Sequence, residues 1–292
     1  MSRSPRNVVF LGATRGMGRA LARMFAERGD RLFLLGRDTE GLGLAATDLA
    51  VRSGDFVGQA SCDLRDPSGF DAALVAAKVA LGTIDVVVIT AGVFATQESL
   101  EDDAARTADL LTVDFTNTVL FCEAAKRTLL ADGGGTLCVF GSVAGDRGRS
   151  PVVLYGAAKA GLAAYLEGLD HRHHRDGLRV VRVKPGFVRT SMTDGLREPP
   201  FAGEPEDVAL RVMSAIDRET PEVYAPFVWG PLMRIVRSLP RAVMRRAAFL
   251  RQERFLAARR GRLRPMRAWF RSPRPDVRAG GDGDGDRRAD VT

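Results

Sequence analysis

The stretch VVFLGATRGMGRALARMFAERG, residues 8–29, decides the fold of this chain. It begins with the apolar run Val8–Leu11, passes through the glycine-rich turn GATRGMG at 12–18 and continues as a helical pattern over Met17–Arg28. A short, continuous, β-branched run is typical of a strand covered on both faces. A strand, a glycine-rich turn and a helix in this order predict the first unit of a sheet that binds a dinucleotide.

The same alternation continues through the first 225 residues. Further strands are predicted at Arg31–Gly36, Asp55–Ser61, Ile84–Ile89, Thr136–Phe140, Leu178–Val183 and Glu222–Tyr224. Helical patterns between them cover Ser68–Leu81, Ala108–Leu130, Val152–His174 and Pro205–Asp217. We therefore expect an α/β fold in residues 1–225, a doubly wound parallel sheet of Rossmann type. A basic amphipathic helical extension is expected at 226–271 and a disordered tail at 272–292.

The charge of the chain is unevenly distributed. Residues 1–224 carry 26 basic and 30 acidic side chains, whereas residues 225–275 carry fourteen arginines and one glutamate, a net charge of +13. No stretch approaches the ~18 apolar residues of a spanning helix, and we expect no signal peptide. Cys62, Cys122 and Cys138 are scattered and odd in number, which favours reduced thiols over disulfides, and no metal site is expected.

The glycine-rich turn predicts where the dinucleotide binds. Gly12, Gly16 and Gly18 permit positive φ angles and a close approach of the backbone to a pyrophosphate, which would rest on the following helix N-terminus. Ligands of such sheets bind at the carboxyl ends of the strands, where we find Arg37, Asp63, Ala91, Gly92, Ser142, Pro185 and Gly186.

The end of the second strand predicts which cofactor binds. NAD sites commonly place an acidic residue there to bind the ribose 2′-hydroxyl. In this chain LFLLGRD places Arg37 directly after the strand, and Arg15 lies inside the glycine-rich turn. Guanidinium groups pair bidentately with phosphate, so the two arginines favour NADP(H) with its 2′-phosphate. The alternative is that both are solvated surface residues. Asp63, in CDL after the third strand, is a candidate contact for the adenine.

Ser142, Tyr155 and Lys159 are the candidate catalytic residues, in GSVAG and YGAAK. Tyr155 and Lys159 are four residues apart, so on one helix they share a face. A nearby cation favours the phenolate, and we expect Lys159 to lower the Tyr155 pKa and make the phenol a usable acid or base. Ser142 could bind the same substrate oxygen. These groups suit the proton half of a carbonyl/alcohol interconversion.

Together these motifs resemble the short-chain dehydrogenase/reductase superfamily over roughly residues 7–225. The resemblance also rests on TAGV at 90–93 and PGFVRT at 185–190. It implies that Tyr155 is the general acid/base, that Lys159 binds the nicotinamide ribose and that Ser142 orients the carbonyl. It also implies a homo-oligomer and cofactor contacts from Thr14, Met17, Leu64, Ala91, Gly92, Tyr155, Lys159, Pro185, Gly186, Val188 and Thr190.

Two residues depart from the pattern of that superfamily. Leu11 stands in place of the usual threonine before the first glycine, which should affect the rigidity of the loop. Asp114, in VDFTN, stands where a catalytic asparagine usually holds a water of the proton relay. An aspartate can still accept a hydrogen bond from that water, but it adds a negative charge near Lys159. Asn117, one helical turn further on, is an alternative for the same role.

A narrower resemblance covers about residues 141–250, which look like the decaprenylphosphoryl-2-keto-ribose reductases. It implies a lipid-linked keto-sugar as substrate. The alternatives are a 3-oxoacyl or 3-ketosphinganine type reductase, and a cofactor-binding scaffold weakened by Asp114.

The basic segment after residue 225 mixes arginines with aromatic and aliphatic side chains. We expect Pro231, Pro240 and Pro265 to divide it into short helices that bind an anionic membrane surface, at the cytoplasmic face of the cell membrane. The alternative is packing on the parent domain or on a second copy of the chain. Nucleic-acid binding is not expected, because no recognised motif accompanies the charge.

Overall fold

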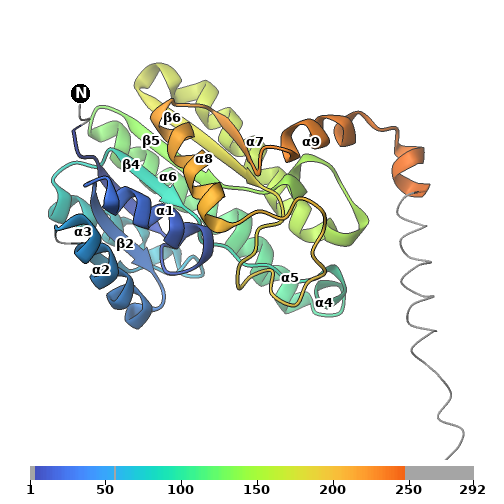
Figure 1. Cartoon of the computed structure of the whole chain (residues 1–292), viewed down its shortest axis with the longest axis horizontal. Helices are drawn as coiled ribbons and strands as arrows, with labels where there is room; N and C mark the ends of the chain where they lie inside the picture. Colours follow the sequence, from blue (N-terminus) through green and yellow to red (C-terminus); the bar gives the residue numbers. More distant parts are fainter. Residues whose placement is uncertain (1–3, 56, 247–292) are drawn as a thin grey trace, which may run out of the picture. The chain divides into compact units, whose positions relative to one another are not determined.

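One sheet of seven parallel strands forms the centre of the protein, in the order β3-β2-β1-β4-β5-β6-β7 (Figure 1). The structure is a computed structural model and describes residues 4–55 and 57–246. The strands are β1 (Asn7–Leu11), β2 (Arg31–Gly36), β3 (Gly58–Ser61), β4 (Val86–Ile89), β5 (Gly135–Phe140), β6 (Leu178–Pro185) and β7 (Glu222–Ala225). The chain runs outward from β1 to β3 and then returns to β4, so the strand order reverses beside β1. This confirms the predicted doubly wound sheet, and ligands of such sheets bind at that reversal.

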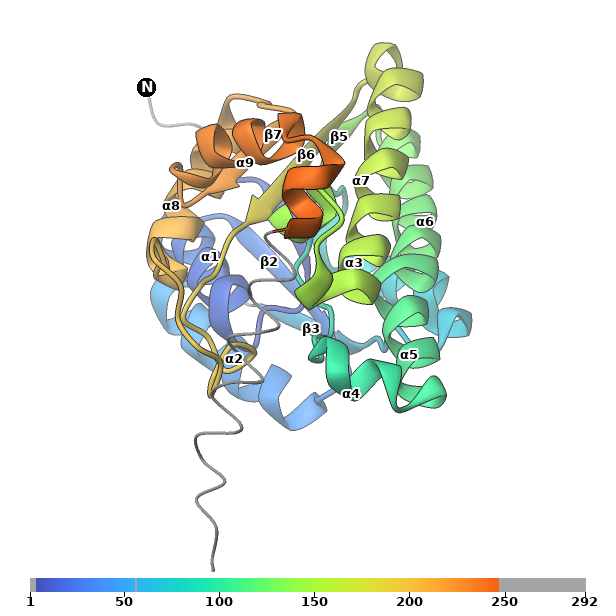
Figure 2. The same ribbon diagram turned by 90° about the vertical axis from the view of Figure 1, so that its right-hand side faces the viewer.

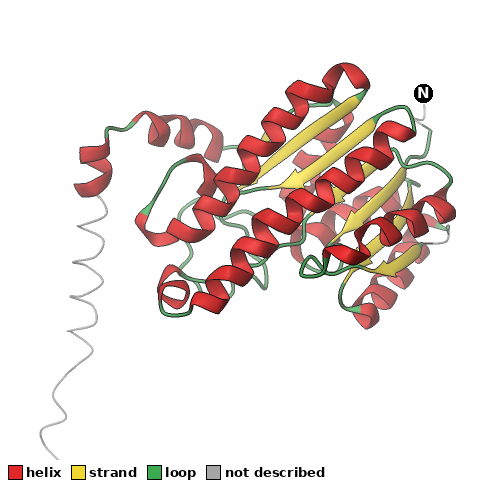
Figure 3. Ribbon diagram, turned by 180° about the vertical axis from the view of Figure 1, so that it is seen from behind, coloured by secondary structure: helices red, strands yellow, loops and turns green. Residues whose placement is uncertain are grey.

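Helices cover both faces of the sheet. On one face lie α1 (Gly16–Glu27), α2 (Thr39–Ser53) and α8 (Pro205–Asp217), which are in front in Figure 1. On the other face lie α3 (Phe70–Leu81), α6 (Thr118–Ala131) and α7 (Val153–His173), and Figure 3 views the molecule from that side. Strand β4 is at most 1% exposed at every position, as its unbroken run of valine and isoleucine predicts.

The helix before the fifth strand differs from its prediction. The sequence predicted one helix over Ala108–Leu130. The structure has α5 (Ala104–Leu111), then a π-helical turn η2 (Thr112–Asn117), then α6. A π-helical turn contains one extra residue and often marks a functional site. Here it carries Asp114.

Besides a helical turn at 241–246, the remaining elements are short. They are α4 (Gln97–Glu101), α9 (Trp229–Ser238) and the 3-10 turns η1 (Pro67–Gly69), η3 (Val143–Asp146), η4 (Ser150–Val152) and η5 (His174–Asp176). Pro231 does not divide the C-terminal segment as predicted, because it lies in the first turn of α9, where its missing N–H would have no partner in any case. Helix α9 packs beside β7, as Figure 2 also shows. Pro265 and the predicted tail at 272–292 lie outside the described residues.

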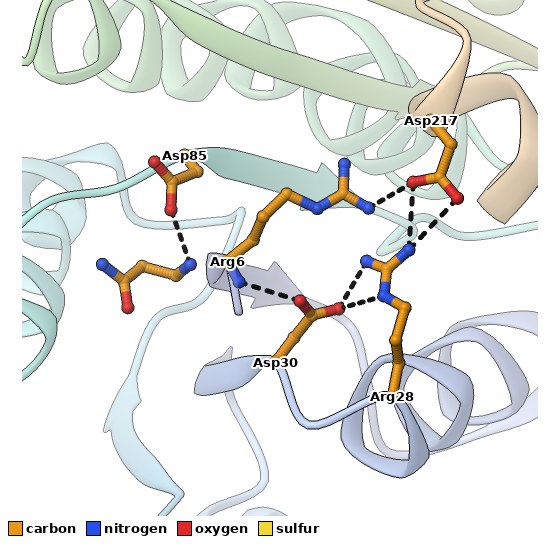
Figure 4. Close-up of polar contacts among 6 residues, drawn as sticks. Arg6, Arg28, Asp30, Asp85 and Asp217 are labelled. Atoms are coloured by element: carbon orange, nitrogen blue, oxygen red, sulfur yellow. Dashed lines mark hydrogen bonds and ion pairs between the residues drawn. The ribbon is translucent and has the colours of Figure 1, made fainter. Parts of the chain in front are cut away.

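An ion cluster closes the amino end of the sheet (Figure 4). The Arg6 and Arg28 side chains both bind Asp217, at the end of α8, and Arg28 also binds the buried carboxylate of Asp30. The Arg6 backbone N–H donates to Asp30 at 2.8 Å, and Asp85 accepts from the backbone of β1 at 2.7 Å. The cluster joins α1, α8 and two strands at the end of the sheet opposite the glycine-rich turn.

Candidate active site

A cavity of about 300 Å³ lies at the carboxyl ends of β1 to β4, beside the reversal of strand order. Eight sequence-predicted residues line it: Gly12, Thr14, Arg15, Arg37, Asp63, Leu64, Ala91 and Gly92. The cavity therefore brings together the glycine-rich turn, both arginines and the residues that follow β3 and β4.

The glycine-rich turn has no room for side chains at two positions. Gly12 has a φ of 103°, and a Cβ there would lie 2.6 Å from the backbone nitrogen of Ala91. A Cβ on Gly18 would lie 2.2 Å from the Gly12 oxygen. Thr90, directly after β4, donates from Oγ1 to that same Gly12 oxygen at 2.8 Å. This hydrogen bond holds the turn in place, although Leu11 stands where a threonine is usual.

Other predicted cofactor residues lie near the cavity without lining it. Gly16, Met17 and Gly18 begin α1, and Met17 packs against the core. Thr190, after β6, contacts Gly16: its methyl group lies 3.1 Å from the position of a Cβ there. The next two residues, Ser191 and Met192, line the cavity, and neither is among the predicted cofactor residues. Their only sequence signal is their position directly after PGFVRT.

Directly after β6, Gly186 packs against Trp229 of α9. Pro185 ends β6, and a Cβ on Gly186 would lie 2.0 Å from Trp229 Nε1, so the indole of α9 lies directly on that glycine. The same Nε1 donates to the Phe201 carbonyl at 3.2 Å. Val188 is buried and forms a bridge to Gly203. Helix α9 therefore holds both ends of the loop between β6 and α8.

Charged groups surround the far end of the cavity. Arg15 and Arg37 are exposed and both line it, together with Asp38. Asp38 accepts the Gly41 backbone N–H at 2.9 Å as the N-cap of α2. Its carboxylate also lies 3.9 Å from an Arg15 nitrogen. Asp38, next to Arg37, is thus bound to the N-terminus of α2 and lies near the charge of Arg15.

Tight packing of η3 on α7 brings Ser142 to Tyr155. A Cβ on Gly145 would lie 2.7 Å from the Lys159 backbone carbon, and one on Gly156 would lie 2.9 Å from the Ala144 oxygen. Ser142 Oγ accepts the Ala144 N–H at 3.0 Å and lies close enough to Tyr155 to lower its pKa. The structure therefore joins two residues that are thirteen positions apart in the sequence.

Lys159 is buried and faces both Tyr155 and Asp114. Its Nζ lies 5.7 Å from the centre of the Tyr155 ring and 3.5 Å from Asp114 Oδ2. Asp114 Oδ1 accepts the Val93 N–H at 2.8 Å. A Cβ on Gly92 would lie 3.5 Å from Lys159 Nζ, so the lysine lies at the edge of the cavity. Asn117 donates to the Leu64 carbonyl at 2.6 Å, which leaves its side chain engaged away from Lys159.

The ionisation of these groups differs from the sequence prediction. Burial raises the pKa of Tyr155 above its ordinary value, and the Lys159 charge and the Ser142 hydrogen bond offset this only in part. Burial also raises the pKa of Asp114 and outweighs the attraction of Lys159. For Lys159, burial lowers the pKa, but Asp114 and Tyr155 together reverse that effect and raise it. Lys159 therefore lowers the Tyr155 pKa as expected, but burial outweighs this effect and the net shift is upward.

The sequence also predicted reduced cysteines, no metal site and no membrane-spanning helix. Cys62, Cys122 and Cys138 are free and buried, and burial raises the pKa of Cys62 to about 11. Within residues 4–55 and 57–246, no group of three potential ligands could hold a metal ion. Over the same ranges, none of the helices combines the length and the apolar character needed to span a membrane.

Comparison with known proteins identifies the class to which this fold and site belong. A sequence model of the family described as short chain dehydrogenase matches residues 6–200. An uncharacterized oxidoreductase of Mycobacterium tuberculosis is 31% identical over 239 residues, which are 82% of this chain and 96% of the relative. The human 3-oxoacyl-[acyl-carrier-protein] reductase is 33% identical over 64% of this chain and 77% of its own length. The solved structure of levodione reductase superposes with a TM-score of 0.70 at 23% identity, over 77% of this chain and 98% of that one.

The chain belongs to the short-chain dehydrogenase/reductase family and is an oxidoreductase. The family implies an NAD(P)(H) cofactor, and the residues at the cavity fit such a group. Gly12, Thr14 and Arg15 line the cavity directly before α1, whose N-terminus would bind a pyrophosphate favourably.

Proposed function

We propose that the protein is an NADPH-dependent carbonyl reductase in which Ser142, Tyr155 and Lys159 handle the carbonyl oxygen. The observation that supports this proposal is the packing of η3 on α7, which brings Ser142 near Tyr155 on the helix that also carries Lys159. The nicotinamide group supplies the hydride when it is bound. Ser142 and Tyr155 hold the carbonyl oxygen by hydrogen bonds, and Tyr155 donates the proton that converts it to an alcohol.

Tyr155 is in the protonation state that reduction requires. Its pKa lies above the ordinary value, so the phenol is protonated at neutral pH but is a weaker acid than an ordinary phenol, which the Lys159 charge offsets in part. Lys159 stabilises the phenolate left after proton transfer, and Asp114 holds the ammonium in place.

Tyr155→Phe tests the assigned acid. The variant should lose carbonyl reduction by about 10²–10⁴-fold, because it lacks only the proton donor. NADPH affinity, measured by quenching of protein fluorescence, should stay nearly unchanged, since the phosphate contacts are untouched. Normal turnover of an activated ketone by this variant would remove Tyr155 from the mechanism.

NADPH is the proposed cofactor because Arg15 and Arg37 line the cavity near the end of β2. The wild-type protein should prefer NADPH to NADH, and Arg37→Asp should shrink or reverse that preference. The ratio of kcat/KM values for the two cofactors measures this. Arg65→Gln is a matched control, because Arg65 also lines the cavity but pairs with Asp109 at 2.7 Å. Equal use of both cofactors by the wild type would contradict the assignment.

For the substrate, we propose a lipid-linked ketone, such as a polyprenylphosphoryl-2-keto-pentose, reached at an anionic membrane surface. Support comes from the resemblance of residues 141–250 and from α9, which exposes Arg234, Ile235 and Arg237. A 3-oxoacyl substrate remains the second candidate, favoured by the similarity to the human 3-oxoacyl-[acyl-carrier-protein] reductase.

Vesicle binding tests the membrane proposal. The full chain should sediment with anionic vesicles and not with neutral ones, and salt should release it, because each arginine near an anionic surface contributes about 1 kcal/mol. Replacing Arg234 and Arg237 by Gln should weaken binding roughly tenfold or more. Equal binding to neutral and anionic vesicles would contradict an electrostatic membrane contact. Truncation is a poor test if it starts at 226, since Trp229 packs on Gly186.

A further inference from the structure

A second cavity, of about 290 Å³, lies outside the cofactor cavity and is lined mainly by arginines. Its residues are Arg147, Gly148, Arg241, Met244 and Arg245. Arg147 directly follows η3, the turn that begins after Ser142. Arg241 and Arg245 are four residues apart on the helical turn at 241–246, so they share one face of it.

The positive charge of this cavity is not neutralised by neighbouring carboxylates. Among the described residues, no ion pair joins Arg147, Arg241 or Arg245 to an acidic side chain, whereas Arg182 and Arg189 each bind two. The sequence holds no aspartate or glutamate from 223 to 252. Like charges four residues apart on a helix repel each other, and a third arginine adds to that repulsion. An anion in the cavity would relieve it.

The structure holds Arg147 in a defined place. Its guanidinium donates one hydrogen bond, to the Leu239 carbonyl at 2.9 Å, and a guanidinium has five N–H donors. The preceding residue, Asp146, has a buried side chain that pairs with Lys184 Nζ at 2.7 Å and accepts from the Tyr224 hydroxyl at 2.8 Å. These contacts fix the end of η3 on β6 and β7.

A short segment joins one wall of the cavity to the proposed reacting centre. Arg147 follows Ser142 by five residues, so their Cα atoms are at most about 18 Å apart even for an extended chain. The turn between them is a 3-10 helix, which shortens the path further.

We propose that Arg147, Arg241 and Arg245 form a subsite for a phosphate group carried by the ketone substrate. Phosphate oxygens match the planar fork of a guanidinium, and three such groups around one cavity can bind a monoester or a diester. The role in substrate binding rests on the proposed carbonyl reduction, but phosphate binding by the cavity does not.

Calorimetry with inorganic phosphate tests the subsite directly. The full chain is first saturated with NADP⁺, so that the cofactor cavity cannot contribute. Replacing Arg241 and Arg245 by Gln should raise the Kd for phosphate at least about tenfold. Replacing Arg234 and Arg237 by Gln removes the same charge from the exposed face of α9 and should leave that Kd unchanged. Arg241→Lys keeps the charge without the fork and should give an intermediate loss; thermal unfolding checks that each variant is folded.

Kinetics with two soluble ketones that differ only by a phosphate ester supplies the second readout. In the Arg241/Arg245 variant, KM should rise at least about tenfold for the phosphorylated ketone and stay constant for the neutral one.

Equal phosphate affinity in wild type and variant, or an equal loss in the Arg234/Arg237 control, would overturn the subsite. If the Arg241/Arg245 variant loses binding to anionic vesicles while its phosphate Kd is unchanged, Arg241 and Arg245 bind the membrane surface instead. If no ketone is reduced but phosphate binds as expected, the proposed function fails and the subsite stands.

Discussion

Asp114 is fully buried on the π-helical turn, with its carboxylate 3.5 Å from Lys159 Nζ. It acts on two neighbours in different ways. Its negative charge raises the pKa of Lys159, which keeps the ammonium charged, and it also raises the pKa of Tyr155, which disfavours the phenolate. Both effects keep the phenol and the ammonium protonated, which suits the proposed reduction. An asparagine would keep the shape of the site but neither effect.

Asp114→Asn should therefore shift the pH dependence of the reverse reaction, alcohol oxidation. Oxidation requires the phenolate, so its rate rises with pH through the pKa of Tyr155. Removing the carboxylate lowers that pKa, and the rising limb of the kcat profile should move to lower pH. Reduction should persist and be faster near neutral pH, because a phenol with a lower pKa is still protonated there and is a stronger proton donor. The amide oxygen of the new asparagine would still accept the Val93 N–H, so folding should be preserved. A shift to higher pH, or a large loss of activity in both directions, would show that the aspartate itself has a catalytic role.

At the scale of elements, β1, β2, β4 and β5 were predictable because each is a nearly continuous apolar run that the sheet buries, whereas β3 (GQAS) and β7 (EVYA) are not. Helix α2 was not predicted, because only Leu42 and Leu49 of its residues are buried, while Leu44 and Val51 are exposed. Its readable signals were the caps: Asp38 at the N-terminus and Gly54, with a φ of 70°, at the C-terminus. The π-helical turn η2 has no equivalent signal, because no side-chain cap marks either of its ends.

The candidate site likewise has features that the sequence predicts and features that it does not. Residues within one motif, such as Tyr155 and Lys159, were found from their spacing. The contact of Trp229 with Gly186 joins segments 43 positions apart and no local pattern predicts it. The sign of the Tyr155 pKa shift was also out of reach, because helical spacing shows the neighbouring cation but not the burial that outweighs it.

At the scale of the whole molecule, the two ends of the sheet have different tasks. The carboxyl end leaves glycine backbone and arginines open toward the cofactor cavity. The amino end is closed by the ion cluster of Figure 4, in which Asp217 joins Arg6 and Arg28 and so ties α8 to the start of β1 and the end of α1. Because the cluster is distant in the fold from the strand ends that carry Ser142 and Gly12, its loss should affect stability without affecting chemistry.

Asp217→Asn tests this separation through the pH dependence of stability. Burial raises the pKa of Asp217, but Arg28 and Arg6 outweigh it and hold the pKa below the unfolded value of 3.8. A carboxyl whose pKa is depressed on folding stabilises the protein above the unfolded value, and that stability is lost as the pH falls through the folded pKa. The variant should therefore lose about 1 kcal/mol at pH 7, discounted because the side chain is 34% exposed, and this corresponds to a fall in Tm of roughly 2–4 °C. The difference from wild type should shrink as the pH falls below 3.8.

Asp71→Asn is the control, because the pair of Asp71 with Arg127 is largely exposed and its loss should leave Tm unchanged. Thermal unfolding at several pH values, with kcat measured in parallel, decides the outcome. A constant difference at all pH values, or a loss of kcat in the folded variant, would contradict the assignment of this cluster to stability alone.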